Sequence, residues 1–176
     1  FFDRTTTGPV LSSEYTVGAN DVIRIRTAVK VLRSTARIEW TITNDDTVAH
    51  NVGLRYAINQ RAVENNLYYV DPDRGATNQT TVYDGSKVPS QIEVFGRRAE
   101  KDLNDVTTPP FHSRWLLRGN GATEPSKVWV ADSFDLYAGE AVAPTDNYLP
   151  QTTRNTKFSA GLAVAAYFGG DTGYVL

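Results

Sequence analysis

Residues 36–43 read Ala-Arg-Ile-Glu-Trp-Thr-Ile-Thr, with apolar side chains at the even positions and polar side chains at the odd positions. Successive side chains of a β-strand point to opposite faces of a sheet, so this pattern predicts a strand with one buried face. Residues 23–31 alternate in a similar way, and the short segment 32–35 between them suits a hairpin. The two segments are therefore expected to pair as antiparallel neighbours.

A third strand is expected over residues 48–58, after a turn at residues 44–47. The turn reads Asn-Asp-Asp-Thr, and Asn and Asp favour turns because their side chains hydrogen-bond to nearby backbone. The even positions of 48–58 are apolar apart from His50. We expect these three consecutive strands to form an antiparallel meander.

Shorter β-rich segments follow, separated by turn sequences at residues 71–75 and 119–122. Residues 158–168 alternate again, but both faces of that strand carry apolar or small side chains, which predicts burial on both sides. Residues 96–106 are the candidate for a short helix. The other expected strands are centred on residues 67–70, 80–83, 92–95, 115–117 and 128–130.

The whole pattern predicts an all-β fold. We expect an antiparallel β-sandwich of jelly-roll or immunoglobulin-like type, with roughly eight to eleven short strands and at most one or two short helices. A length of 176 residues favours a single domain over 1–176. Because the chain ends in the apolar run Tyr174-Val175-Leu176, we also expect a final strand to lie beyond it.

The composition argues against nucleic-acid binding, cysteine chemistry and a membrane-spanning helix. Eighteen Lys and Arg against twenty Asp and Glu give a net charge of -2, whereas nucleic-acid binding depends on clustered positive charge. The absence of cysteine excludes disulfides, thiolate metal sites and cysteine nucleophiles. The longest apolar stretch, residues 160–168, is far shorter than the ~20 residues of a membrane-spanning helix. We therefore expect no nucleic-acid partner and no membrane span.

Three aromatic residues are candidates for ligand binding: Trp129, Tyr68 and Tyr69. Trp129 is out of phase with Val128 and Val130, which predicts that its ring faces away from the core and lies exposed. An exposed flat ring can stack on a sugar. A carbohydrate-binding module is therefore the alternative function, with polysaccharide as its partner.

Asp71, Asp73 and Asn78 are the candidate metal ligands, because calcium binds carboxylate and amide oxygens. Their spacing matches no defined calcium motif, and Asp is common in turns for structural reasons. We expect no cofactor, with calcium as the alternative.

Neither of the two histidines predicts catalysis. His50 lies in an apolar strand pattern and is interpreted as a half-buried, hydrogen-bonded ring, because no Ser or Cys shows the surroundings of a known nucleophile. His112 follows a Pro-Pro-Phe sequence and is expected to be solvated in a loop. We assign no catalytic residues and predict that the chain is not an enzyme.

Residues 37–56 run from one strand through the Asn-Asp-Asp-Thr turn into His-Asn-Val-Gly-Leu-Arg-Tyr. This segment resembles a strand–turn–strand unit of β-sandwich modules in bacterial surface and exported proteins of unassigned function. The strand over 161–168 also looks like the penultimate core strand of such modules. The resemblance implies a fold and an extracytoplasmic setting, and it implies no activity.

We therefore expect a non-catalytic structural or interaction module of an extracytoplasmic assembly, such as a surface layer, a filament or a complex. The protein is expected to be secreted, at the cell surface or periplasmic. Its expected partners are other protein chains, including further copies of itself. They would add strands at unpaired edges near the extended residues 1–15, the loop 139–156 and the C-terminal end.

Overall fold

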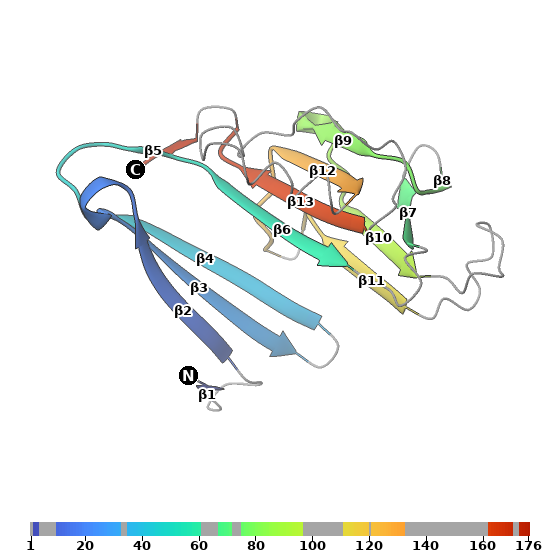
Figure 1. Ribbon diagram of the computed structural model, residues 1–176, viewed down its shortest axis with the longest axis horizontal. Coiled ribbons are helices and arrows are strands. Elements are labelled where there is room, and N and C mark those ends of the chain that lie inside the picture. The colour runs from blue at the N-terminus through green and yellow to red at the C-terminus, as the bar shows by residue number, and fades with distance from the viewer. Residues whose placement is uncertain are drawn as a thin grey trace. The chain divides into compact units, whose positions relative to one another are not determined.

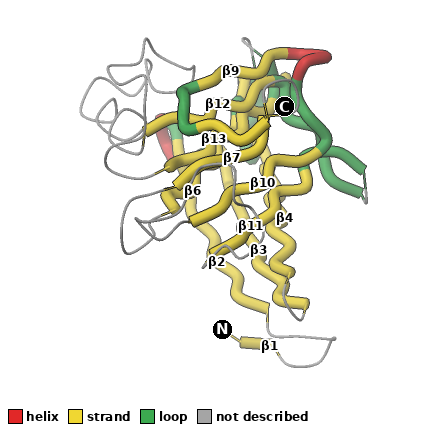
Figure 2. Tube along the Cα trace, turned by 90° about the vertical axis from the view of Figure 1, so that its right-hand side faces the viewer, coloured by secondary structure: helices red, strands yellow, loops and turns green. Residues whose placement is uncertain are grey.

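The computed structural model describes residues 2–3, 10–32, 35–60, 67–71, 75–96, 111–119, 121–132, 162–170 and 173–176. Within these ranges the chain is mostly antiparallel β-structure, with the short 3-10 turns η1 (Ala19–Asp21) and η2 (Gly85–Lys87) between strands (Figure 2). The all-β prediction is confirmed. The helix considered over 96–106 and the loop over 139–156 lie essentially outside the described residues.

The chain divides into two compact units. Unit 1 comprises Phe1–Val52 and Tyr174–Leu176, and unit 2 comprises Gly53–Gly173. The expectation of one domain over 1–176 stays a prediction.

Unit 1 contains a sheet of strand order β1-β2-β3-β4, whose three long strands lie side by side in Figure 1. As expected, β3 and β4 form a hairpin that closes at the pair Leu32 and Thr35. The segment expected as an extended N-terminal arm contains most of β2, which pairs along β3. The strands are β1 (Phe2–Asp3), β2 (Val10–Val17), β3 (Ile23–Leu32) and β4 (Thr35–Asn44).

The meander expected from β3, β4 and a third strand over 48–58 is wrong in its third member. That segment forms β5 (Asn51–Val52) and β6 (Leu54–Gln60), and neither pairs with β4. Instead, β5 pairs with β14 (Tyr174–Val175), and β6 belongs to unit 2. Alternation shows which side chains share a face, but it does not specify the strand that pairs at each edge.

Unit 2 is built from two four-stranded antiparallel sheets (Figure 1). The first has the order β6-β13-β12-β9, and the second has the order β11-β10-β7-β8. The first sheet adds β13 (Leu162–Phe168), β12 (Lys127–Asp132) and β9 (Thr81–Asp84) to β6. The second contains β11 (Phe111–Leu116), β10 (Gln91–Gly96), β7 (Leu67–Asp71) and β8 (Gly75–Thr77).

The turn predicted at residues 71–75 joins β7 to β8, and its last pair is Asp71 with Gly75. Gly75 has a φ of 75°, which a residue with a side chain adopts only with strain. The glycine therefore fits this hairpin.

Both sheets of unit 2 supply side chains to one buried hydrophobic cluster. A second cluster lies on the opposite face of the first sheet, so β13 is buried on both faces, as predicted. The shared cluster includes Leu67, Tyr69, Ile92 and Val94 from the second sheet and Val128, Val130, Leu162 and Val164 from the first. The second cluster contains Trp129, Ala131, Ala163, Ala165 and Tyr167.

Candidate functional site

The three aromatic residues predicted to bind a ligand are all buried. Trp129 is 2% exposed, and Tyr68 and Tyr69 are fully buried. Trp129 does point away from Val128 and Val130, as its phase predicted, but that face of β12 is itself covered. The expectation of an exposed ring platform is therefore wrong, because phase shows where a side chain points and not what covers it.

Tyr68 and Tyr69 are neighbours on β7 and point to opposite faces of the second sheet. Tyr69 belongs to the shared cluster, and its hydroxyl donates a 2.6 Å hydrogen bond to Thr81 Oγ1. Tyr68 stacks on Phe95 with 5.4 Å between ring centroids, and Phe95 stacks on His112 at 4.5 Å. These rings therefore hold adjacent strands together.

His112 is part of this stack, which the sequence did not predict. It lies on β11, with Nε2 3.4 Å from the Glu93 carboxylate on β10. Arg114 reaches the same carboxylate at 2.9 Å. The facing Glu93–Arg114 ion pair stabilises these neighbouring strands by about 0.2–1 kcal/mol, so it supports the β10–β11 pairing. No sequence signal revealed it, because the contact depends on register between distant strands.

The three predicted metal ligands have different environments. Asp71 is buried at the end of β7 and accepts a 2.6 Å hydrogen bond from the Tyr83 hydroxyl. Asn78 is half-buried after β8, and Asp73 lies outside the described residues. The described ranges contain no group of three or more His, Cys, Asp or Glu arranged to hold a metal ion. Calcium binding stays a prediction.

Burial, followed by the hydrogen bond to Asp71, raises the pKa of Tyr83 far above its usual value. The phenol therefore stays protonated at neutral pH and acts as a donor. Because Tyr83 is on β9 and Asp71 is on β7, the bond joins the two sheets of unit 2. This contact has the properties of a structural link.

His50 is a half-buried, hydrogen-bonded ring, as predicted. Its Nε2 lies 2.8 Å from Asp46 Oδ2. The hydrogen bond with His50, followed by one from the Thr47 backbone, holds the pKa of Asp46 below its usual value. The His50 backbone also exchanges hydrogen bonds of 3.0 and 3.1 Å with Leu176. This cluster therefore fastens the C-terminal segment within unit 1.

The sheet of unit 1 has one apolar face. Residues paired across antiparallel strands share a face, and the pairing places Tyr15, Ile25 and Ile42 in one row. Leu11 and Tyr15 are 51% and 48% exposed, and Val31 is 40% exposed. Ile23 and Ile25 of the same face are buried, so its exposed large apolar side chains lie on β2 and at Val31 on β3. The apolar face consists of Leu11, Tyr15, Val17, Ile23, Ile25, Val29, Val31, Ile38, Trp40 and Ile42.

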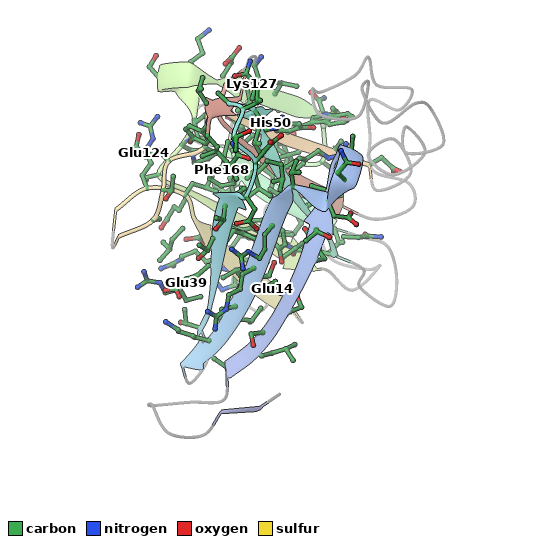
Figure 3. All side chains as sticks on the ribbon, turned by 90° about the vertical axis from the view of Figure 1, so that its left-hand side faces the viewer. Glu14, Glu39, His50, Glu124, Lys127 and Phe168 are labelled. Atoms are coloured by element: carbon green, nitrogen blue, oxygen red, sulfur yellow. The ribbon has the colours of Figure 1, made fainter. Side chains whose placement is uncertain are left out.

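The opposite, polar face carries charges of both signs; Figure 3 labels Glu14 on β2 and Glu39 on β4. Lys30 and Arg37 each lie 2.9 Å from the Glu39 carboxylate. The hydrogen bond from Lys30 holds the pKa of Glu39 below its usual value, with further lowering from the charge of Arg37. Glu39 is therefore ionised at neutral pH.

The ten-residue strand β4 ends the strand order, so its outer edge carries no partner strand in the described part of the chain. One hydrogen bond shows which residues of β4 bond to β3: the Asp45 N–H donates to the opposite Val22 carbonyl at 2.8 Å. Hydrogen-bonded pairs alternate with non-hydrogen-bonded pairs in an antiparallel ladder. Odd-numbered residues of β4 therefore bond to β3, and even-numbered residues such as Ile38 direct their N–H and C=O outward.

Comparison with known proteins finds no matching family model, no matching curated protein and no matching solved structure. No helix in the described ranges has the length and apolar character needed to cross a membrane.

Proposed function

We propose that the chain is a non-catalytic structural module of an extracytoplasmic assembly, and that unit 1 is the part that binds other protein chains. In this proposal unit 2 is an antiparallel β-sandwich that serves as the stable body. The assembly is a surface layer, a filament or a multi-subunit complex at the cell surface, in the periplasm or outside the cell.

The observation that carries the proposal is the open sheet of unit 1. Its edge strand β4 has outward-directed backbone groups, and the apolar face of the same sheet is exposed at Leu11 and Tyr15 on β2 and at Val31 on β3. Long edge strands next to apolar surface add further strands readily. A protein chain that pairs with β4 would satisfy these outward-directed backbone groups.

The proposed sandwich is supported by polar contacts at both sides of the shared core. Ser113 on β11 donates a 2.8 Å hydrogen bond to Gln60 on β6, and Tyr83 on β9 donates to Asp71 on β7. Each contact joins the two sheets, and hydrophobic side chains fill the space between. Two sheets with a common core are the defining feature of a sandwich.

The extracytoplasmic setting is supported by sequence features. The chain has no cysteine, which is compatible with an oxidising compartment. Residues 37–56 resemble a unit of bacterial surface and exported modules. These observations concern location only.

Hydrogen–deuterium exchange of the β4 amides tests the proposal. The Ile38 and Ile42 amides are expected to exchange rapidly in the purified, highly diluted chain and slowly in the native material from the producing cells. Amides of β13, which is paired on both sides, are the internal control and should be protected in both samples. Equal, rapid exchange of the Ile38 and Ile42 amides in both samples would overturn the proposal.

A further inference from the structure

We propose that β4 pairs with β4 of a second copy of this chain, antiparallel and about a two-fold axis through Ile38. This inference rests on the proposed function and names the partner of the same edge. It follows from hydrogen-bond phase, side-chain complementarity and the continuity of the sheet faces.

The hydrogen-bond phase permits this pairing. Even-numbered residues of β4 direct their backbone groups to the outer edge, as the Asp45–Val22 bond establishes. With the axis at Ile38, even-numbered residues of one copy lie opposite even-numbered residues of the other. Ile38 then lies opposite its own symmetry mate, and the two residues can exchange both backbone hydrogen bonds.

The charges are self-complementary in this register. Arg37 of each copy lies opposite Glu39 of the other, which gives two identical ion pairs on the polar face. Both pairs occupy non-hydrogen-bonded positions, where facing side chains approach each other most closely. Arg37 is exposed and Glu39 is half-buried, so the surface is open to a partner.

The neighbouring pairs fit as well. Small Ala36 lies opposite large Trp40 on the apolar face, and Thr35 lies opposite Thr41 on the polar face. Moving the axis by one residue places either Arg37 or Glu39 opposite its own copy. Like charges that face each other across strands are destabilising. Arg37 and Glu39 therefore favour the register centred on Ile38 and disfavour the two registers shifted by one residue.

The face pattern distinguishes β4 from the part of β2 that extends beyond its pairing with β1 at Val10 and Leu11. Because even-numbered residues of β3 bond to β4, its odd-numbered residues bond to β2, and Ser12, Glu14 and Thr16 direct their backbone groups outward. Those three residues carry the polar face. Antiparallel pairing of β4 with β2 of another copy would put Ile38 beside them and join apolar face to polar face. Pairing of β4 with itself keeps each face continuous.

Sedimentation velocity and light scattering test the pairing on the intact chain, from low micromolar to several hundred micromolar. The parent protein is expected to form a reversible dimer. Arg37→Glu and Glu39→Arg should each weaken self-association at least about tenfold, because each variant places like charges opposite each other. An equimolar mixture of the two variants should recover the dimer, because each acidic position then faces a basic one.

Arg26→Glu is the matched control. Arg26 is exposed on the same polar face but lies on the inner strand β3, so its reversal should leave the dimer intact. Circular dichroism establishes that every variant is folded. Recovery of the dimer in the mixture shows that both variants are folded, because a misfolded component could not complete the strand pairing.

A parent that stays monomeric throughout overturns the self-pairing, and so do assemblies larger than a dimer. A dimer unaffected by either charge reversal, or a mixture that fails to recover it, does the same. A monomeric parent whose β4 amides are nevertheless protected in native material would leave the proposed function standing with a different partner. Unprotected native β4 amides would instead refute the proposed function itself.

Discussion

The phenolic hydroxyl of Tyr83 donates a 2.6 Å hydrogen bond to Oδ2 of Asp71 across the two sheets of unit 2. Asp71 is 3% exposed, so its carboxylate depends on protein groups in place of water. A buried polar group that loses its partner retains the cost of desolvation. The Tyr83 hydroxyl therefore contributes to the cohesion of unit 2.

Replacing Tyr83 by Phe should lower the free energy of unfolding by about 1.5–3 kcal/mol, the range for a hydrogen bond to a charged group. Urea unfolding followed by tryptophan fluorescence measures the change. Tyr174→Phe removes a hydroxyl from an exposed tyrosine and should change stability by less than about 0.5 kcal/mol. A Tyr83→Phe protein as stable as its parent would show that the bond contributes nothing.

The contact between Gln60 and Ser113 should appear as energetic coupling between the sheets. In a double-mutant cycle of Gln60→Leu and Ser113→Ala, we expect an interaction energy of about 0.5–1.5 kcal/mol. Equilibrium unfolding of the parent, the two single variants and the double variant gives this value. A control cycle that pairs Gln60→Leu with Ser86→Ala, at an exposed residue of η2, should give none. Coupling of zero in the first cycle would contradict the link between β6 and β11.

Trp129→Ala should be among the most damaging substitutions in unit 2. Its ring is 2% exposed, and truncation of a buried tryptophan costs about 3–5 kcal/mol. Val82 pairs with Trp129 on the same face but is 46% exposed, so Val82→Ala should cost less than about 1 kcal/mol. Thermal and urea unfolding of the two variants provide the comparison. Similar losses from both would show that this face is not packed around the tryptophan.

The Asp46 carboxyl should titrate below its usual value in the folded protein. Its lowered pKa means that the ionised form is favoured in the folded state, so the stabilisation is present above the unfolded pKa and is lost as pH falls through the folded pKa. A carbon-detected NMR titration measures the midpoint. His50→Ala should move the midpoint upward, because the hydrogen bond with His50 is the largest contribution. An unchanged midpoint would assign the shift to the Thr47 backbone instead.

Much of the local structure could be read from the sequence. The strand over 36–43 and the hairpin before it formed as predicted, and Asp71 pairs with Gly75 at the ends of the predicted turn. Leu162 and Val164 are fully buried, as the pattern of residues 158–168 indicated. Each of these predictions depends on neighbouring residues of the chain, where strand periodicity and turn chemistry act directly.

Burial was predicted less well than orientation. Trp40, Leu54 and Tyr56 lie at the even, mostly apolar positions of their segments, yet each is only half-buried. His112 was expected in a loop and instead stacks on Phe95 in a strand. A side chain's exposure depends on the layer that covers it, and residues far away in the sequence provide that layer.

Local alternation by itself therefore determined where strands lie and which side chains share a face, because the two-residue period is set by the backbone of each strand. The tertiary structure alone decided that β6 pairs with β13, that Trp129 is buried and that the edge of β4 is open. The physical reason is that edge pairing and coverage are long-range choices: the same alternating strand can pair at either edge and be covered on either face.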